Sequence, residues 1–194
     1  ANHRIVTISG TGGCGKTRLV CEIARRMSNK YSGGIWFVDL STIEKDELVD
    51  KQLMKTFELA EIPGKNGLDI VIEKILHERL LIILDNCEHL INASARLAHV
   101  FISDGTGLSL LNTSRETLGI QGEKIWVLPS LTLPDQIKIA NSDAAEESEA
   151  VAMFSDRAQM SNPGFQLVEK NVSDVRIICQ MVDGLPLAIE LVAC

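Results

Sequence analysis

Apolar and polar positions follow two patterns in turn along the first two thirds of the chain. Short apolar runs, typical of strands, are each followed by a longer segment with apolar residues at helical spacing. Because strands that alternate with helices form parallel sheets covered by those helices, the pattern predicts an α/β fold with a five-stranded parallel sheet. The expected strands are residues 4–9, 35–39, 80–84, 108–112 and 125–128.

The segments between these runs predict amphipathic helices. Pro63-Gly64 is expected to separate the second helix from the third. The run 80–84 is apolar at every position, which is typical of a strand buried on both faces. The expected helical faces are Leu19, Val20, Ile23, Ala24 and Met27; Val49, Leu53, Phe57 and Ala60; Leu68, Val71, Ile72, Ile75 and Leu76; and Ile91, Ala95, Ala98 and Ile102.

The character of the chain changes at a short connector between Pro129 and Pro134, beyond which only helical periodicity is found. We therefore place a domain boundary near residues 129–134. The sequence predicts an α/β domain over residues 1–130 and a small all-helical bundle over residues 131–194.

Three residues mark helix ends in the expected bundle, where the first helix has the face Ala150, Val151, Phe154 and Ala158. Ser173 is a candidate N-cap for a second helix. Gly184 stands where a C′ residue is expected, and Pro186 where the first residue of a third helix is expected.

One stretch carries chemistry that its residue types almost fully determine. The spacing G-x-x-x-x-G-K-T follows the apolar run 5–8 and leads into a helical segment, which separates a phosphate-binding loop from a chance glycine cluster. Glycines let the backbone turn its N–H groups toward anionic oxygens, and the helix N-terminus adds partial positive charge. The expected nucleotide contacts are Gly10, Thr11, Gly12, Gly13, Cys14, Gly15, Lys16, Thr17 and Arg18.

Polar side chains at the ends of other strands complete the expected site, because ligands bind beyond the carboxyl ends of parallel strands. Lys16 supplies charge for the β- and γ-phosphates, and the Thr17 hydroxyl is a ligand for Mg²⁺. Asp85 follows the apolar run 80–84 and suits a Walker B acid on the same ion. In Thr113-Ser114-Arg115, a hydroxyl and the guanidinium are candidates for the γ-phosphate. For Arg115, a surface ion pair is equally consistent with the spacing.

Composition and charge limit the expected cellular location and binding partners of the chain. The chain has 194 residues and a net charge of −7, with no basic stripe, so we expect no direct nucleic-acid binding. Five cysteines with no C-x-x-C spacing favour reduced thiols and a cytoplasmic location. The sequence has neither a long apolar run nor a signal-peptide pattern, so no membrane association is expected.

The sequence also narrows the nucleotide class. Neither N-K-x-D, the usual reader of guanine, nor the ABC-type signature L-S-G-G-Q occurs. A whole strand–helix passage at 35–60 separates the phosphate loop from Asp85. This insertion is similar to that of the AAA⁺ and RecA side of the P-loop ATPases, in which the Walker A and Walker B strands are not adjacent. ATP and ADP are therefore the expected nucleotides.

Five motifs occur in order over the whole chain: G-T-G-G-C-G-K-T-R-L, W-F-V-D-L, L-L-I-I-L-D-N-C-E-H-L, T-S-R-E and D-G-L-P-L-A-I-E-L. Together they resemble the NB-ARC/STAND ATPases, most closely the ATPase modules of bacterial AfsR-like and LuxR-like transcriptional regulators. The resemblance implies a P-loop domain of the ASCE/AAA-like type followed by an ARC1-like helical subdomain. It also implies that Lys16, Asp85 and Arg115 are the catalytic set, with Arg115 as the sensor-1 residue. Pro186 of the G-L-P-L element would pack near adenine and ribose.

The sequence departs from the family pattern in ways that affect the expected mechanism. Asn86 stands where many relatives have a second acid, and Glu88 is nearby, so the general base is unassigned between them. The upstream segment that helps to hold adenine in the family and the winged-helix lid are both absent. We therefore expect this sequence to be part of a larger regulator.

Two functions are consistent with these features. The first is a regulatory switch in which ADP and ATP stabilise different states, with slow hydrolysis, other domains of the parent protein as partners, and self-association allowed in the ATP state. The second is an actively hydrolysing AAA⁺-like motor subunit, which needs an arginine in trans; Arg157 and Arg176 are candidates by location alone. A scaffold without nucleotide is the least favoured, because Lys16, Thr17 and Asp85 are all present.

Overall fold

A computed structural model describes residues 3–104, 107–134 and 148–194 of the chain. The chain forms two compact units. The first consists of Ala1–Gly10 and Lys16–Val127, and the second of Thr11–Gly15 and Leu128–Cys194.

A five-stranded parallel sheet forms the centre of the first unit, in the order β2-β3-β4-β1-β5. The fold class predicted from the strand–helix alternation is therefore confirmed. β4 lies between β1, which precedes the glycine-rich loop, and β3, which ends in Asp85. The strands are β1 (Ile5–Ser9), β2 (Ile35–Asp39), β3 (Leu81–Asp85), β4 (Ser109–Ser114) and β5 (Glu123–Val127).

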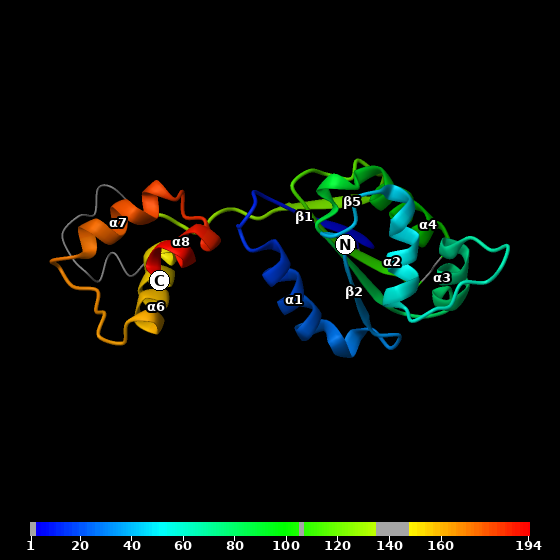
Figure 1. Cartoon of the computed structure of the whole chain (residues 1–194), viewed down its shortest axis with the longest axis horizontal. Helices are drawn as coiled ribbons and strands as arrows, with labels where there is room; N and C mark the ends of the chain where they lie inside the picture. The colour runs from blue at the N-terminus through cyan, green and yellow to red at the C-terminus, as the bar shows by residue number, and fades with distance from the viewer. Residues whose placement is uncertain (1–2, 105–106, 135–147) are drawn as a thin grey trace. The chain divides into compact units, whose positions relative to one another are not determined.

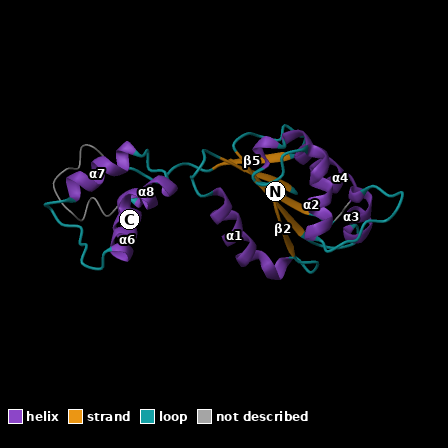
Figure 2. Cartoon of the chain, in the orientation of Figure 1, coloured by secondary structure: helices purple, strands orange, loops and turns teal. Residues whose placement is uncertain are grey.

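Helices cover both faces of this sheet, with α1 on one face and α2, α3 and α4 on the other (Figure 2). The helices of this unit are α1 (Lys16–Met27), α2 (Val49–Thr56), α3 (Gly67–Ile75) and α4 (Ile91–Asp104). Short 3-10 turns η1 (Ser28–Lys30), η2 (Asp46–Leu48) and η3 (Cys87–His89) connect the elements.

The core of this unit lies between the sheet and α2, α3 and α4. All five residues of β3 are buried, as the unbroken apolar run predicts. Val38, Leu53, Val71 and Leu97 are fully enclosed with them. Each Å² of apolar surface that is buried stabilises the fold by about 25 cal/mol. Packing of this layer therefore holds in place the strand ends where polar groups gather.

Within its described residues, the second unit contains the helices α6 (Glu149–Ser161), α7 (Val172–Met181) and α8 (Pro186–Ala193) (Figure 1). Its core is formed by Val151, Phe154, Val175, Cys179 and Ile189. The structure thus contains the small helical bundle that the apolar spacing predicts.

Three details differ from the sequence prediction. Ala60 lies outside α2, because the helix ends at Thr56 and Glu58 has a positive φ of 55°. Ser173 is not an N-cap: α7 begins at Val172, so Ser173 lies in its first turn. Gly184 stands one residue beyond the C′ position, which Asp183 occupies with a φ of 51°.

Candidate functional site

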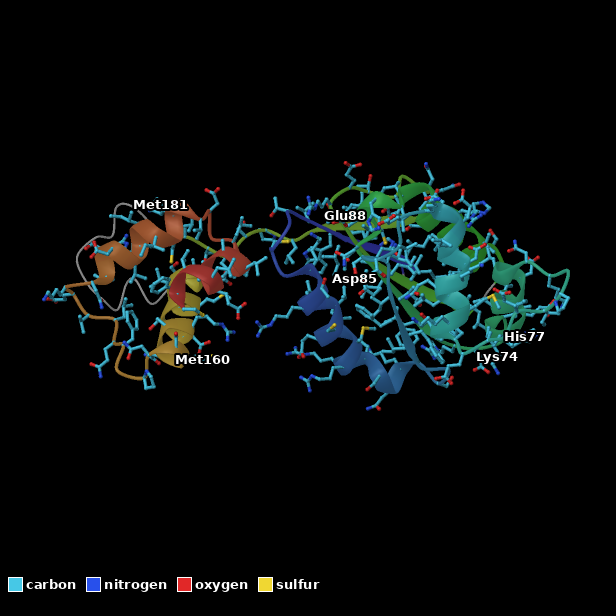
Figure 3. The ribbon with its side chains drawn as sticks, viewed as in Figure 1. Lys74, His77, Asp85, Glu88, Met160 and Met181 are labelled. Atoms are coloured by element: carbon cyan, nitrogen blue, oxygen red, sulfur yellow. The ribbon has the colours of Figure 1, made fainter. Side chains whose placement is uncertain are left out.

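The hydroxyl of Thr17 and the carboxylate of Asp85 meet at the carboxyl end of the sheet, although 68 residues separate them in sequence. Thr17 Oγ1 lies 3.0 Å from each oxygen of Asp85. Thr17 is in the first turn of α1, directly after the glycine-rich loop. Asp85, which is labelled in Figure 3, is the last residue of β3. The structure therefore brings together the two residues that the sequence predicts as metal ligands.

Asp85 is only 2% exposed, and its neighbours hold its carboxylate in place. Thr113 Oγ1 donates to Oδ1 at 2.5 Å, and Asn86 Nδ2 donates to Oδ2 at 3.2 Å. Asn86 has a left-handed backbone with φ 63°, and its N–H donates to Thr113 Oγ1 at 3.0 Å. Asn tolerates this conformation better than most residues, so the identity of residue 86 suits the turn that follows β3.

Thr113 has a role that the sequence analysis did not assign. Its hydroxyl, one of the candidates for a γ-phosphate contact, joins the Asp85 carboxylate to the Asn86 amide. The hydroxyl of Ser114 accepts from the N–H of Glu116 at 3.1 Å. Parallel pairing of Leu84 with Asn112 places Asp85 beside Thr113, so the signal for this contact lies in strand register.

Lys16 is 8% exposed at the start of α1, and its Nζ donates to the carbonyl of Gly10 at 2.9 Å. The ammonium therefore lies at the point where β1 leads into the loop. Arg18, which the sequence places among the nucleotide contacts, is exposed in the same first turn of α1. These positions keep two cations at the helix N-terminus, where the helix dipole also favours anions.

The loop residues Thr11–Gly15 belong to the second unit, and two of its glycines have backbones that other residues rarely adopt. The φ angles are +77° at Gly13 and +98° at Gly15. Within this same unit, the N–H of Leu187 donates to the carbonyl of Gly13 at 3.2 Å. Leu187 follows Pro186, which is the first residue of α8 as the sequence predicts.

Arg115 is the first residue after β4, and its guanidinium pairs with Glu88. Arg115 Nε lies 3.2 Å from Glu88 Oε1, and the side chains are 64% and 22% exposed. Ser9 pairs with Ser114 in the sheet, and the Ser9 hydroxyl donates to the carbonyl of Arg115 at 3.3 Å. Arg115 thus lies beside Ser9, which precedes the glycine-rich loop. It also makes an ion pair, the alternative role that the sequence allowed for this residue.

Asp39 is a further acid at this edge of the sheet that the sequence analysis did not select. It is the last residue of β2 and is aligned with Asp85 across the sheet. The N–H of Ser41 donates to Asp39 Oδ1 at 2.8 Å and lowers the pKa of this carboxyl, with a smaller contribution from Asn86. Asp39 is therefore ionised and adds negative charge beside β3.

Thr17 and Asp85 fit a magnesium ion by their chemistry. A hydroxyl and a buried carboxylate are both oxygen donors, and Mg²⁺ is commonly held by one or two protein groups together with phosphates and waters. Within residues 3–104, 107–134 and 148–194, no group of three or more His, Cys, Asp or Glu side chains is arranged to hold a metal. The arrangement therefore suits a metal that arrives with phosphate oxygens.

The two arginines considered for action on a neighbouring subunit are both engaged within the helical unit. Arg157 Nε lies 3.6 Å from Glu190 Oε1, and this arginine side chain is 19% exposed. Arg176 is 8% exposed. Neither side chain is presented at the surface as an arginine that reaches into another active site must be.

These features define a P-loop nucleotide-binding protein: a parallel sheet with β4 between β1 and β3, a glycine-rich loop after β1, and a buried acid at the end of β3. Residues 1–120 match the NB-ARC domain, and the chain belongs to this family. The resemblance identified from the sequence motifs is confirmed.

Two curated relatives cover the whole of this chain. The chain is 38% identical over 193 residues to a Mycobacterium tuberculosis protein provisionally named an HTH-type transcriptional regulator, covering 100% of this chain and 20% of that protein. It is 32% identical over 193 residues to an uncharacterized M. tuberculosis protein, covering 100% of this chain and 46% of that one. The chain thus spans between a fifth and a half of these relatives.

Two solved structures share the fold at low sequence identity. One is a Signal Transduction ATPase with Numerous Domains (STAND) protein with a tetratricopeptide repeat sensor from Pyrococcus horikoshii. Its TM-score is 0.56 at 16% identity, covering 97% of this chain and 27% of that one. The other is Drosophila ORC bound to DNA, with a TM-score of 0.62 at 12% identity, covering 97% of this chain and 54% of that one. Among the helices of the described segments, none has the length and apolar character needed to span a bilayer.

Proposed function

We propose that this chain is the ATP- and ADP-binding switch module of a multidomain transcriptional or signalling regulator, with slow ATP hydrolysis. The observation that carries the proposal is the contact of Thr17 Oγ1 with both carboxylate oxygens of Asp85 at 3.0 Å. A hydroxyl from the loop-bearing helix and an acid from a buried strand form the pair that a phosphate-bound Mg²⁺ requires. Membership of the NB-ARC family supports the same function.

Each group of the proposed site is assigned one contact by its chemistry. Lys16 would leave the Gly10 carbonyl for the β- and γ-phosphates, and the N–H groups of Gly10 to Arg18 would surround the phosphate oxygens. Thr17 and Asp85 would hold Mg²⁺, which neutralises phosphate charge when bound. Arg115 would report the γ-phosphate, and Pro186 would lie near adenine and ribose. Only ATP carries the γ-phosphate, so Arg115 would distinguish the two nucleotides.

The switch is favoured over the motor by two observations. Arg157 and Arg176, the trans candidates, are engaged or buried inside the helical unit. Arg115 is paired with Glu88, so a carboxylate of the same chain already balances its charge. A ligand shifts a conformational equilibrium only by its different affinity for the two states, and the γ-phosphate is the group that differs between ATP and ADP.

The regulatory setting is proposed from the relatives. One of them is provisionally named an HTH-type transcriptional regulator, and this chain corresponds to about a fifth of its length. The net charge of −7 supports a role in which other domains of the parent protein read DNA. A cytoplasmic location and self-association in the ATP state complete the proposal.

Titration calorimetry and steady-state hydrolysis test this function together. We expect ATP and ADP to bind in the presence of Mg²⁺ and turnover to remain well below one per second, under the usual kcat range of about 1–1000 s⁻¹ for enzymes. Binding combined with several turnovers per second would reject the switch in favour of the motor. A chain that binds neither nucleotide would reject both.

A further inference from the structure

The ion pair between Glu88 and Arg115 joins two segments that each end at the expected phosphate site. Glu88 is in η3, three residues after Asp85, and Arg115 directly follows β4. Their closest approach is 3.2 Å, between Arg115 Nε and Glu88 Oε1. Arg115 is the group proposed to meet the γ-phosphate. Its ion pair with Glu88 therefore links this carboxylate to the proposed phosphate contact.

The second oxygen of this carboxylate is in an unusual environment. Glu88 Oε2 is buried and has no hydrogen-bond partner among the residues that the structure describes, although a carboxylate oxygen normally accepts from a donor when it leaves water. Such an oxygen is ready to accept a hydrogen bond from a small polar molecule that enters beside it. A water molecule is the smallest molecule that meets this requirement.

Asn86, the other candidate for the general base, has a different role. Its Nδ2 donates to Asp85 Oδ2 at 3.2 Å, and its N–H donates to Thr113 Oγ1 at 3.0 Å. A carboxamide has no basic group with a pKa suited to taking a proton from water near neutral pH. Asn86 therefore positions Asp85, and the base must come from another residue.

We propose that Glu88 orients the attacking water and accepts its proton in ATP hydrolysis, and that Arg115 holds Glu88 inactive until the γ-phosphate draws the guanidinium away. This inference rests on the proposed function and specifies how its site is regulated. In the reaction the water oxygen bonds to the γ-phosphorus, and the bond from this phosphorus to the β–γ bridging oxygen breaks. One water proton passes to the Glu88 carboxylate, leaving ADP and inorganic phosphate.

The exposure of the two partners fits this exchange. The Arg115 side chain is 64% exposed, so its ion pair is weak and easily given up for a phosphate, which offers more negative charge and a two-point contact. Glu88 is 22% exposed and remains in place when the arginine leaves. The γ-phosphate thus removes the arginine and brings the reacting phosphorus close to the freed carboxylate.

The binding test compares wild type, E88Q, R115A and the double variant by calorimetry with Mg²⁺ and either ADP or a non-hydrolysable ATP analogue. E88Q should tighten analogue binding by about two- to fivefold, the ratio that an exposed ion pair is worth, and leave ADP binding unchanged. R115A should remove the preference for the analogue, and E88Q should add nothing in the R115A background. Equal analogue affinity in wild type and E88Q would overturn the proposal.

The kinetic test measures single-turnover cleavage of bound ATP by wild type, E88Q and E116Q. E88Q should slow cleavage by about 100-fold or more, the usual contribution of a general base. Glu116 is exposed next to Arg115 and makes no side-chain contact with Asp85 or Glu88 among the described residues, so E116Q is the matched control and should cleave at the wild-type rate.

The outcomes separate this inference from the proposed function. Cleavage by E88Q at the wild-type rate would overturn the role of Glu88 and leave nucleotide binding intact. A wild-type chain that binds neither ADP nor the analogue would instead reject the proposed function itself, and the role of Glu88 with it.

Discussion

The ammonium of Lys16 donates to the carbonyl of Gly10 at 2.9 Å, so the lysine that is expected to meet phosphate is held by the strand end that precedes its own loop. The side chain is 8% exposed. A cation at this depth is positioned before nucleotide arrives, and its hydrogen bond to Gly10 can be exchanged for one to a phosphate oxygen. Replacing it should therefore affect binding more than folding.

Lys16→Ala should abolish the stabilisation of the chain by nucleotide. Mg-ATP or ADP at about 100 times its Kd adds about 2.7 kcal/mol to the free energy of unfolding. For a chain of this size that corresponds to a rise of roughly 5–10 °C in Tm. Lys30→Ala, which removes the same charge from the exposed end of η1, should keep the full rise. An equal shift in the two variants would contradict the role of Lys16.

Magnesium removal should weaken nucleotide binding in the wild-type chain but have little further effect in Thr17→Val. Valine keeps the shape of threonine and removes the hydroxyl that contacts Asp85 at 3.0 Å. Chelation should therefore lower wild-type ATP affinity by about tenfold or more. A tenfold loss corresponds to about 1.4 kcal/mol of binding free energy, here the lost phosphate–metal contact. Thr42→Val, at an exposed position after β2, is the control and should respond to chelation as the wild type does. Calorimetry with and without chelator measures both.

Gly15→Ala should impair nucleotide binding through the backbone alone. Gly15 has a φ of +98°, and a Cβ there would meet nothing within 4 Å, so the change adds strain without a clash. An L-residue forced into positive φ costs about 1–2 kcal/mol. Gly64→Ala is closely matched, with a φ of +82° and the same open space. Both variants should lose similar stability in thermal melting, whereas Gly15→Ala alone should lose ATP affinity.

Gly184→Ala should destabilise the helical unit. The added Cβ would lie 2.5 Å from the carbonyl oxygen of Leu131, and Gly184 also has a φ of +63°. A clash with backbone and a positive φ together should cost about 2–4 kcal/mol, at the upper end of single-residue effects. Gly164→Ala, where the nearest atom is the side-chain oxygen of Asn162 at 3.4 Å, should stay within about 1 kcal/mol of wild type. Urea unfolding followed by circular dichroism would show the difference.

Two of the five thiols should react quickly with a water-soluble disulfide reagent. Cys21 and Cys194 are exposed, whereas Cys14, Cys87 and Cys179 are buried. Burial raises the pKa of Cys87 to about 12 and that of Cys179 to about 11, so both stay as neutral thiols and react poorly. In denaturant, all five thiols should react with the reagent. Rapid modification of Cys87 in the folded chain, seen by mass spectrometry of peptides, would contradict this assignment of burial.

The parts of the fold that the sequence predicted depend on local patterns. The run 80–84 is apolar at every position, and β3 is buried throughout, because a strand covered on both faces excludes polar side chains. Pro186 begins α8 because its fixed φ and missing N–H suit the first helical position. The spacing of the glycine-rich loop likewise placed Lys16 and Thr17 at the start of α1.

The parts that were missed depend on contacts between distant segments. Ser173 has the chemistry of an N-cap, but packing begins the helix at Val172. The contact of Thr113 with Asp85 follows from strand register across the sheet, and the pairing of Arg115 with Glu88 follows from two loops that meet only after β3 and β4 have paired. Single residues reveal the chemistry they can perform, whereas their partners are set by tertiary structure.

The central place of β4 has a consequence for the order in which the protein becomes functional during synthesis. Neighbouring strands lie about 4.8 Å apart, so β1 and β3 are held about 10 Å from each other only once β4 fills the space between them. A ribosome makes Lys16, Thr17 and Asp85 well before it makes residues 109–114. A nascent chain therefore carries both side chains proposed to hold Mg²⁺ before the proposed ATP site can form, and nucleotide would stabilise only the later stages of folding.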